Sequence, residues 1–128
     1  MWFRQDLRVH DNQAFAAAVL AAKRRGGELI CVYVWSETED GDKTSWPMGE
    51  ASRAWLVNSL CSLDADLRLK YGSKRGLTFM KGDHALALSV ACKSVNSNQV
   101  FTSERFEPFH VQNDEKVRLT LKGDENEN

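Results

Sequence analysis

The sequence predicts an open parallel α/β sheet with helices on both faces, and three observations support this fold class. Short apolar runs alternate with longer helical patterns along the chain, which is typical of βαβ units. The run LICVYVW at residues 29–35 is continuously apolar, as expected for a strand buried on both faces of a parallel sheet. The chain has 128 residues, 42% hydrophobic and 27% charged, which is the balance of one globular domain.

The first half of the chain predicts two strands and two helices. Residues 1–3 begin a short apolar strand, and Asn12 offers an N-cap for the Ala- and Leu-rich helix at 13–25. Three basic residues fill the last turn of that helix, where cations suit the helix dipole. After the strand at 29–35, leucines spaced by 4, 3 and 4 residues predict one packing stripe along a helix at 50–71.

The second half predicts two more strand–helix pairs and a tail. The strands are expected at 77–80 and 99–102, and the helices at 84–95 and 109–121. We expect one domain over residues 1–122, followed by a polar, acidic tail over 123–128.

Composition and motifs exclude several function classes. Lys plus Arg is 17 and Asp plus Glu is 18, so the net charge of −1 argues against a whole-surface electrostatic grip on nucleic acid or anionic lipid. No apolar run is long enough to span a bilayer, and no secretory signal is visible. The three histidines are isolated, so no metal site is expected, and neither a phosphate-binding glycine loop nor a nucleophile elbow is present.

Three cysteines lie about 30 residues apart, in apolar stretches: Cys31, Cys61 and Cys92. Their number and spacing suit neither a disulfide framework nor a metal site. We therefore expect buried free thiols in a reducing compartment.

Tryptophans gather in the loops where strands are expected to end. Trp35 closes the strand at 29–35, Trp46 precedes a proline, and Trp55 lies in the first turns of the next helix. With Arg53 near that helix N-terminus, these indoles would suit a flat, partly anionic heteroaromatic ligand. The alternative is structural: Trp55 belongs to the core and Trp35 caps the sheet.

Acidic residues also gather in the loop at 36–45: Glu37, Glu39, Asp40 and Asp42. We interpret these loop acids most simply as a solvated surface turn.

Four motifs, in order, resemble the photolyase/cryptochrome family. WFRQDLRVHDN at residues 2–12 is similar to the family's opening W-F-R-x-D-L-R-x-x-D-N. VW at 34–35, GEASRAWL at 49–56 and RFEP at 105–108 follow in the family's order. The W-P-x-G-x-A-S-R-x-W-L pattern is closer to plant-like cryptochromes and related photolyases than to the animal branch.

The resemblance implies the N-terminal α/β domain of the family, a Rossmann-like sheet of order 3-2-1-4 with the fifth strand missing. In the family this domain often carries an antenna chromophore, either methenyltetrahydrofolate or an 8-hydroxy-deazaflavin, and it packs against a helical domain that binds FAD. That helical domain is absent from this chain, which we therefore expect to be inactive in repair by itself. DNA would be contacted only through the full-length protein, and no membrane partner is expected. An intracellular location is implied, whether nucleus, cytoplasm or chloroplast.

The chain departs from the family's pattern in three places. Members have further strand residues before Trp2, so the chain starts inside the first strand. Phe109 and His110 stand where folate-binding bacterial photolyases place an Asn-Glu pair. Trp46 stands where those members have a contacting histidine.

The expected antenna site lies over the carboxyl ends of the strands. Trp35, Ser36 and Glu37 would form its floor. Trp46 would contribute from the loop, and Arg53 from the helix, where a guanidinium can meet a carboxylate or ring oxygen. Glu107 would close the side after the last strand.

Two other readings remain open. The chain could be a stand-alone small-ligand or protein-interaction module derived from that domain. It could also be an unrelated open-sheet nucleotide-binding protein.

Overall fold

The computed structural model describes residues 1–39 and 47–126. Strands and helices alternate along these residues until α3, which is followed by a further helix. The elements are β1 (Trp2–Phe3), α1 (Gln13–Arg25), β2 (Cys31–Trp35), α2 (Glu50–Tyr71), β3 (Leu77–Lys81), α3 (His84–Ser94) and α4 (Pro108–Asn126). The α/β class predicted from the sequence is therefore confirmed.

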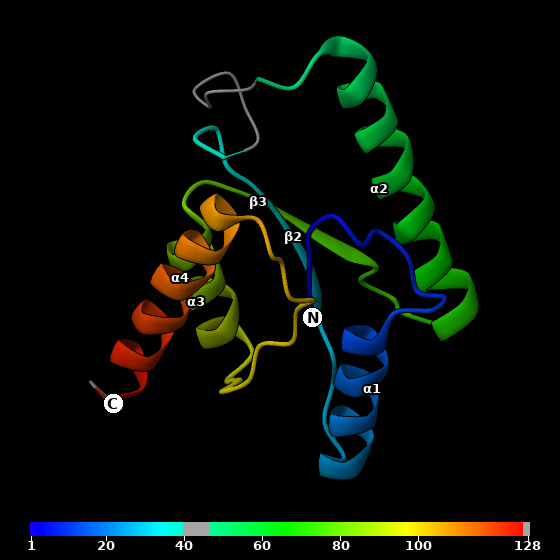
Figure 1. The fold of residues 1–128 in the computed structure, drawn as a ribbon. Helices are drawn as coiled ribbons and strands as arrows, with labels where there is room; N and C mark the ends of the chain where they lie inside the picture. The colour runs from blue at the N-terminus through cyan, green and yellow to red at the C-terminus, as the bar shows by residue number, and fades with distance from the viewer. Residues whose placement is uncertain (40–46, 127–128) are drawn as a thin grey trace.

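The three strands form a parallel sheet in which β2 lies between β1 and β3. In this register Phe3 is opposite Tyr33, and Tyr33 is opposite Phe79. Helices α1 and α2 cover one face of the sheet, and α3 and α4 cover the other (Figure 1).

Alternation along β2 divides the core between these two faces. Cys31 and Tyr33 pack toward α1 and α2, whereas Val32 and Val34 pack toward α3 and α4. Successive side chains of a strand point to opposite faces, so a strand with helices on both sides must be apolar throughout. This explains the uninterrupted apolar run that predicted the strand.

Helices α1 and α2 begin and end where the sequence predicts. The Asn12 side chain accepts a hydrogen bond from the Phe15 amide at 3.0 Å, which caps the start of α1. Gly26 and Gly72 end the two helices in the left-handed conformation, with φ of 63° and 65°. Leu60, Leu63 and Leu67 are buried, which confirms the packing stripe on α2.

The prediction of a fourth strand at residues 99–102 is wrong, because this segment is not a strand in the structure. It lies beside β1, where the Trp2 amide donates to the Phe101 carbonyl at 2.8 Å. A single backbone bond does not make a ladder, and β1 offers only two residues to pair with. The observed order β3-β2-β1 thus agrees with the first three strands of the predicted order 3-2-1-4, and the fourth strand is missing from the part of the chain that the structure describes.

The last helix is longer than expected. The sequence predicts a helix over 109–121, but α4 begins at Pro108 and extends to Asn126. Proline suits the first helical position because that residue needs no intrahelical N–H. Among the residues that the structure describes, no helix is both long and apolar enough to cross a membrane.

Candidate functional site

An apolar cleft opens between the first half of α2 and the adjacent face of β2 and β3, with a volume of about 440 Å³. Strand residues and helix residues contribute its walls in similar number. The lining residues are Tyr33, Trp35, Phe79, Met80 and Lys81 from the strands, and Arg53, Leu56, Val57 and Leu60 from α2. This size falls within the range of small-molecule sites, about 300–1,000 Å³.

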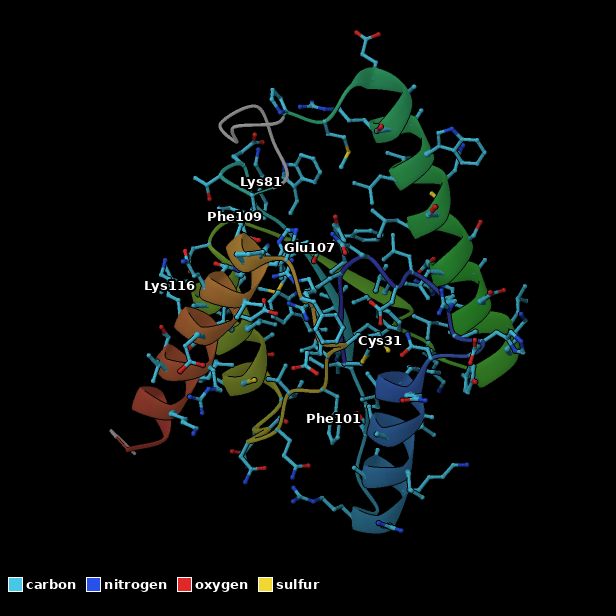
Figure 2. All side chains as sticks on the ribbon, in the orientation of Figure 1. Cys31, Lys81, Phe101, Glu107, Phe109 and Lys116 are labelled. Carbon is cyan, nitrogen blue, oxygen red and sulfur yellow. The ribbon has the colours of Figure 1, made fainter. Side chains whose placement is uncertain are left out.

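The lining of the cleft is almost entirely apolar, and two cationic residues, Arg53 and Lys81, contribute to its rim. The Arg53 guanidinium carbon lies 5.8 Å from the centre of the Trp35 ring, within cation–π distance. Arg53 Nε also donates to the Met48 carbonyl at 3.3 Å, which holds the side chain beside the helix N-terminus. Lys81 lies at the carboxyl end of β3 (Figure 2). The arrangement therefore suits a flat apolar ligand with an anionic group at one end.

Glu37 joins the two strands at this end of the cleft. Its Oε1 accepts a hydrogen bond from the Trp35 indole Nε1 at 3.0 Å. The same oxygen lies 3.3 Å from Lys81 Nζ. These two contacts orient the Trp35 ring and keep a cation beside it.

The structure brings three of the predicted site residues together: Trp35, Glu37 and Arg53. Ser36 is buried, and its hydroxyl contacts the Thr38 hydroxyl at 3.0 Å. Glu107 is exposed just before α4 (Figure 2) and is not among the residues that line the cleft. Trp46 lies outside the described residues.

Sequence reasoning missed the contribution of β3 to the cleft. Phe79 is 55% exposed although it lies in a strand, and Lys81 follows two residues later on the same face. The alternation of side chains along the strand could have revealed this contribution. Leu77 packs in the core with residues of α2, and positions 79 and 81 lie on the same face of the strand as Leu77.

Two structural interpretations of the sequence are corrected here. Trp55 is 73% exposed, so it is not a core residue. A helix advances about 100° per residue, which turns position 55 away from the cleft-lining positions 53, 56, 57 and 60. Cys61 is also exposed, so the expectation of buried thiols holds for Cys31 but not for every cysteine.

The loop acids are not all solvated. Glu39 has a side chain only 7% exposed, with Oε2 3.2 Å from His84 Nδ1. Asp40 and Asp42 lie outside the described residues. The interpretation of a simple surface turn is therefore wrong for Glu39, because its side chain is buried inside the protein beside His84.

Glu39 belongs to a polar network at the carboxyl ends of β1 and β2. Arg105 lies 4.0 Å from Glu39 Oε2 and also binds the Asp114 carboxylate. Arg4 binds Asp114 as well, and its second terminal nitrogen donates to the Ser103 carbonyl. The network connects the ends of β1 and β2 with α3 and α4.

Several carboxylates of the domain have pKa values below their ordinary range. Burial alone would raise the pKa of Asp114, but hydrogen bonds from Arg105 and Arg4 outweigh it and lower the pKa. A hydrogen bond from the Leu77 backbone lowers the pKa of Asp64. For Asp83 too, burial is outweighed and the pKa is lowered, by the Leu86 amide and Lys116.

These shifts predict acid-sensitive folding. A carboxylate with a depressed folded-state pKa stabilises the fold above its unfolded pKa, about 3.9, and loses that contribution as the pH falls through the folded value. We expect the free energy of unfolding in urea to fall steeply below about pH 4. Asp64→Asn should flatten this slope, and a wild-type value unchanged down to pH 3 would contradict the prediction.

A parallel sheet covered by helices on both faces, with an aromatic cleft near its carboxyl edge, defines an open α/β domain. Comparison with known proteins then gives the family. A model of the DNA photolyase family matches residues 1–127, so the chain belongs to the DNA photolyase family.

Individual relatives include both photolyases and cryptochromes. The chain is 37% identical over 125 residues to cryptochrome-1 of Arabidopsis thaliana, covering 96% of this chain and 17% of that protein. It is 32% identical over 124 residues to the deoxyribodipyrimidine photo-lyase of Agrobacterium fabrum, covering 97% and 23%. The chain thus spans about a fifth of the length of these relatives.

A solved structure supports the same relationship. The crystal structure of a bacterial class III photolyase from Agrobacterium tumefaciens superposes with a TM-score of 0.75 at 31% sequence identity. The match covers 96% of this chain and 23% of that one.

Proposed function

We propose that this chain is the light-harvesting, antenna-chromophore-binding part of a DNA photolyase or a blue-light cryptochrome. The observation that carries this proposal is the cleft between α2 and β2–β3, with Trp35 and Phe79 as aromatic walls and cations at one end. In this family a methenyltetrahydrofolate or 8-hydroxy-deazaflavin absorbs light and passes the excitation to FAD. Either molecule has a flat heteroaromatic ring, which aromatic side chains bind by stacking.

The residues of the cleft fit such a ring. Trp35 would stack on the ring, held in place by its bond to Glu37. Arg53 and Lys81 would meet an anionic oxygen by charge-assisted hydrogen bonds. Leu56 and Val57 would exclude water from the opposite side. Trp46 and Glu107 remain candidates for further contacts.

We further propose that the partner of this domain is a flavin-binding helical domain, through which the whole protein would contact DNA. The relatives are about four to six times longer than the matched region, so most of their chain lies outside it. Phe106 and Phe109 are 79% and 57% exposed at the start of α4, where Figure 2 labels Phe109. Exposed phenylalanines next to a buried polar network support docking at this end of the domain.

The ligand proposal predicts saturable quenching of tryptophan fluorescence on titration with methenyltetrahydrofolate or 8-hydroxy-deazaflavin. Arg53→Ala and Lys81→Ala should each weaken binding about tenfold, because each removes a charged hydrogen-bond donor. Trp46→Ala tests the loop residue in the same assay, with weaker binding expected.

Trp55→Ala is the matched control. It removes an indole, as Trp46→Ala does, from the helix that also carries Arg53. Trp55 lies on the face of that helix that is turned away from the cleft. Its affinity should equal that of the wild type. Absence of saturable quenching up to high micromolar ligand, or equal affinity in all variants, would refute the proposed site.

A further inference from the structure

The segment after β2, residues 36–39, is attached on two sides. Toward the cleft, Glu37 accepts from the Trp35 indole and contacts Lys81. Toward α3 and α4, Glu39 contacts His84 and Arg105. Only one residue separates the two glutamates, so a shift of one carboxylate displaces the backbone that carries the other.

Within the segment, local bonds form a tight turn. The Glu39 amide donates to the Ser36 carbonyl at 3.2 Å, and the Ser36 and Thr38 hydroxyls are 3.0 Å apart. The backbone bond couples the position of Glu39 to that of Ser36, which directly precedes Glu37. A fixed position of Glu39 therefore restricts the position of Glu37.

The anchor itself lies in a water-poor environment. The side chains of Glu39, His84 and Arg105 are 7%, 5% and 8% exposed. His84 is the first residue of α3, held by the Asp83 cap of that helix, and Asn113 of α4 lies 3.3 Å from its Nδ1. Asp114 binds Arg105 from the other side. Glu39 Oε2 accepts no hydrogen bond within the part of the chain that the structure describes, so the nearby His84 ring and the Arg105 guanidinium are what lie against this buried carboxylate.

We infer that Glu39 is a positioning residue for the cleft. Its buried carboxylate, which lies 3.2 Å from His84 and 4.0 Å from Arg105, fixes the turn at 36–39 and thereby the orientation of the Trp35 indole through Glu37. Glu39 does not line the cleft, so its effect on a ligand is indirect. The effect on ligand affinity rests on the proposed function, whereas the effect on the Trp35 indole does not.

The competing explanation is that Glu39 only balances the charge of Arg105. Neutralising it would then lower thermal stability without changing the environment of Trp35. The two explanations are separated by a local probe at Trp35 and by a second variant that destabilises the fold elsewhere.

The local measurement uses the full chain carrying Trp46→Phe and Trp55→Phe, which leaves Trp2 and Trp35. Trp2 is 3% exposed but its ring lies 5.2 Å from that of His84, so each variant is also measured with Trp35→Phe, and the difference in acrylamide quenching reports on Trp35. In Glu39→Gln we expect the quenching constant to rise about twofold, because the turn opens locally. Glu39→Asp keeps the charge but shortens the side chain, and it should give a smaller rise with better retained stability.

Asp64→Asn is the control for general destabilisation. Asp64 accepts the Leu77 amide at 2.8 Å, at the opposite end of β3 from Lys81. It should lower the thermal midpoint and leave the quenching of Trp35 unchanged.

The ligand measurement uses the natural tryptophans and 8-hydroxy-deazaflavin or methenyltetrahydrofolate as the probe. Glu39→Gln should weaken binding about tenfold, as expected when a supporting residue is lost. If Trp35 quenching stays at the wild-type value in both Glu39 variants, the inference is overturned. If quenching rises but no variant, wild type included, binds either probe, Glu39 is confirmed as positioning Trp35 and the proposed function fails instead.

Discussion

Asp114→Ala is expected to lower the free energy of unfolding by about 3 kcal/mol, because it leaves two buried guanidinium groups without their shared carboxylate. The side chains of Arg4 and Arg105 are 5% and 8% exposed, and both bind this one aspartate. Removing one member of a buried ion pair typically costs about 3–5 kcal/mol. The lower end applies here, since the Asp114 side chain is itself 26% exposed.

The control for this prediction is the neighbouring acid. Glu115 lies on the exposed face of α4 and pairs with Arg118 through a short-range surface contact. Such pairs contribute little to stability, so Glu115→Ala should leave the urea midpoint nearly unchanged. Equal losses in Glu115→Ala and Asp114→Ala would contradict the central role of Asp114.

Phe3→Ala is expected to cost about 3–5 kcal/mol, the usual range for deleting a buried aromatic ring. Phe3 has no exposed surface and lies in β1, where its ring is 5.7 Å from that of Phe15 in α1. Domains of this size have total stabilities of about 5–15 kcal/mol, so the variant should be close to unfolding at 37 °C. Urea unfolding followed by circular dichroism would measure the loss.

Phe106→Ala provides the matched comparison. It removes the same ring from a position that is 79% exposed. Its unfolding free energy should stay within about 0.5 kcal/mol of the wild type. A loss below about 1 kcal/mol in Phe3→Ala would show that β1 is not part of the packed sheet.

The sequence determined the local elements of this domain well. Helices α1 and α2 could be placed to the residue because their signals act over a few positions: an Asn12 cap, a leucine stripe and terminal glycines at 26 and 72. The strand run at 29–35 was recognised for a similar reason, since burial on both faces requires continuous apolar residues.

The family could also be read from the sequence, because its motifs are contiguous stretches of the chain. The match of the family model to residues 1–127 confirms the resemblance. Part of the candidate site could be predicted from the sequence for the same reason. Trp35 and Glu37 adjoin the end of a predicted strand, and Arg53 follows a helix start.

Tertiary structure alone decided which of these residues face one another. It placed Phe79 and Lys81 of β3 across from α2, turned Trp55 outward, and left the segment at 99–102 with one bond to β1. It also buried Glu39 and joined Arg4 to Asp114, which lie 110 residues apart in sequence. Helix caps and periodicity depend on neighbours within one or two turns, and a sequence displays those neighbours directly. Charge pairing and side-chain exposure depend on segments that meet only after the chain has folded, and no local pattern records which segments those will be.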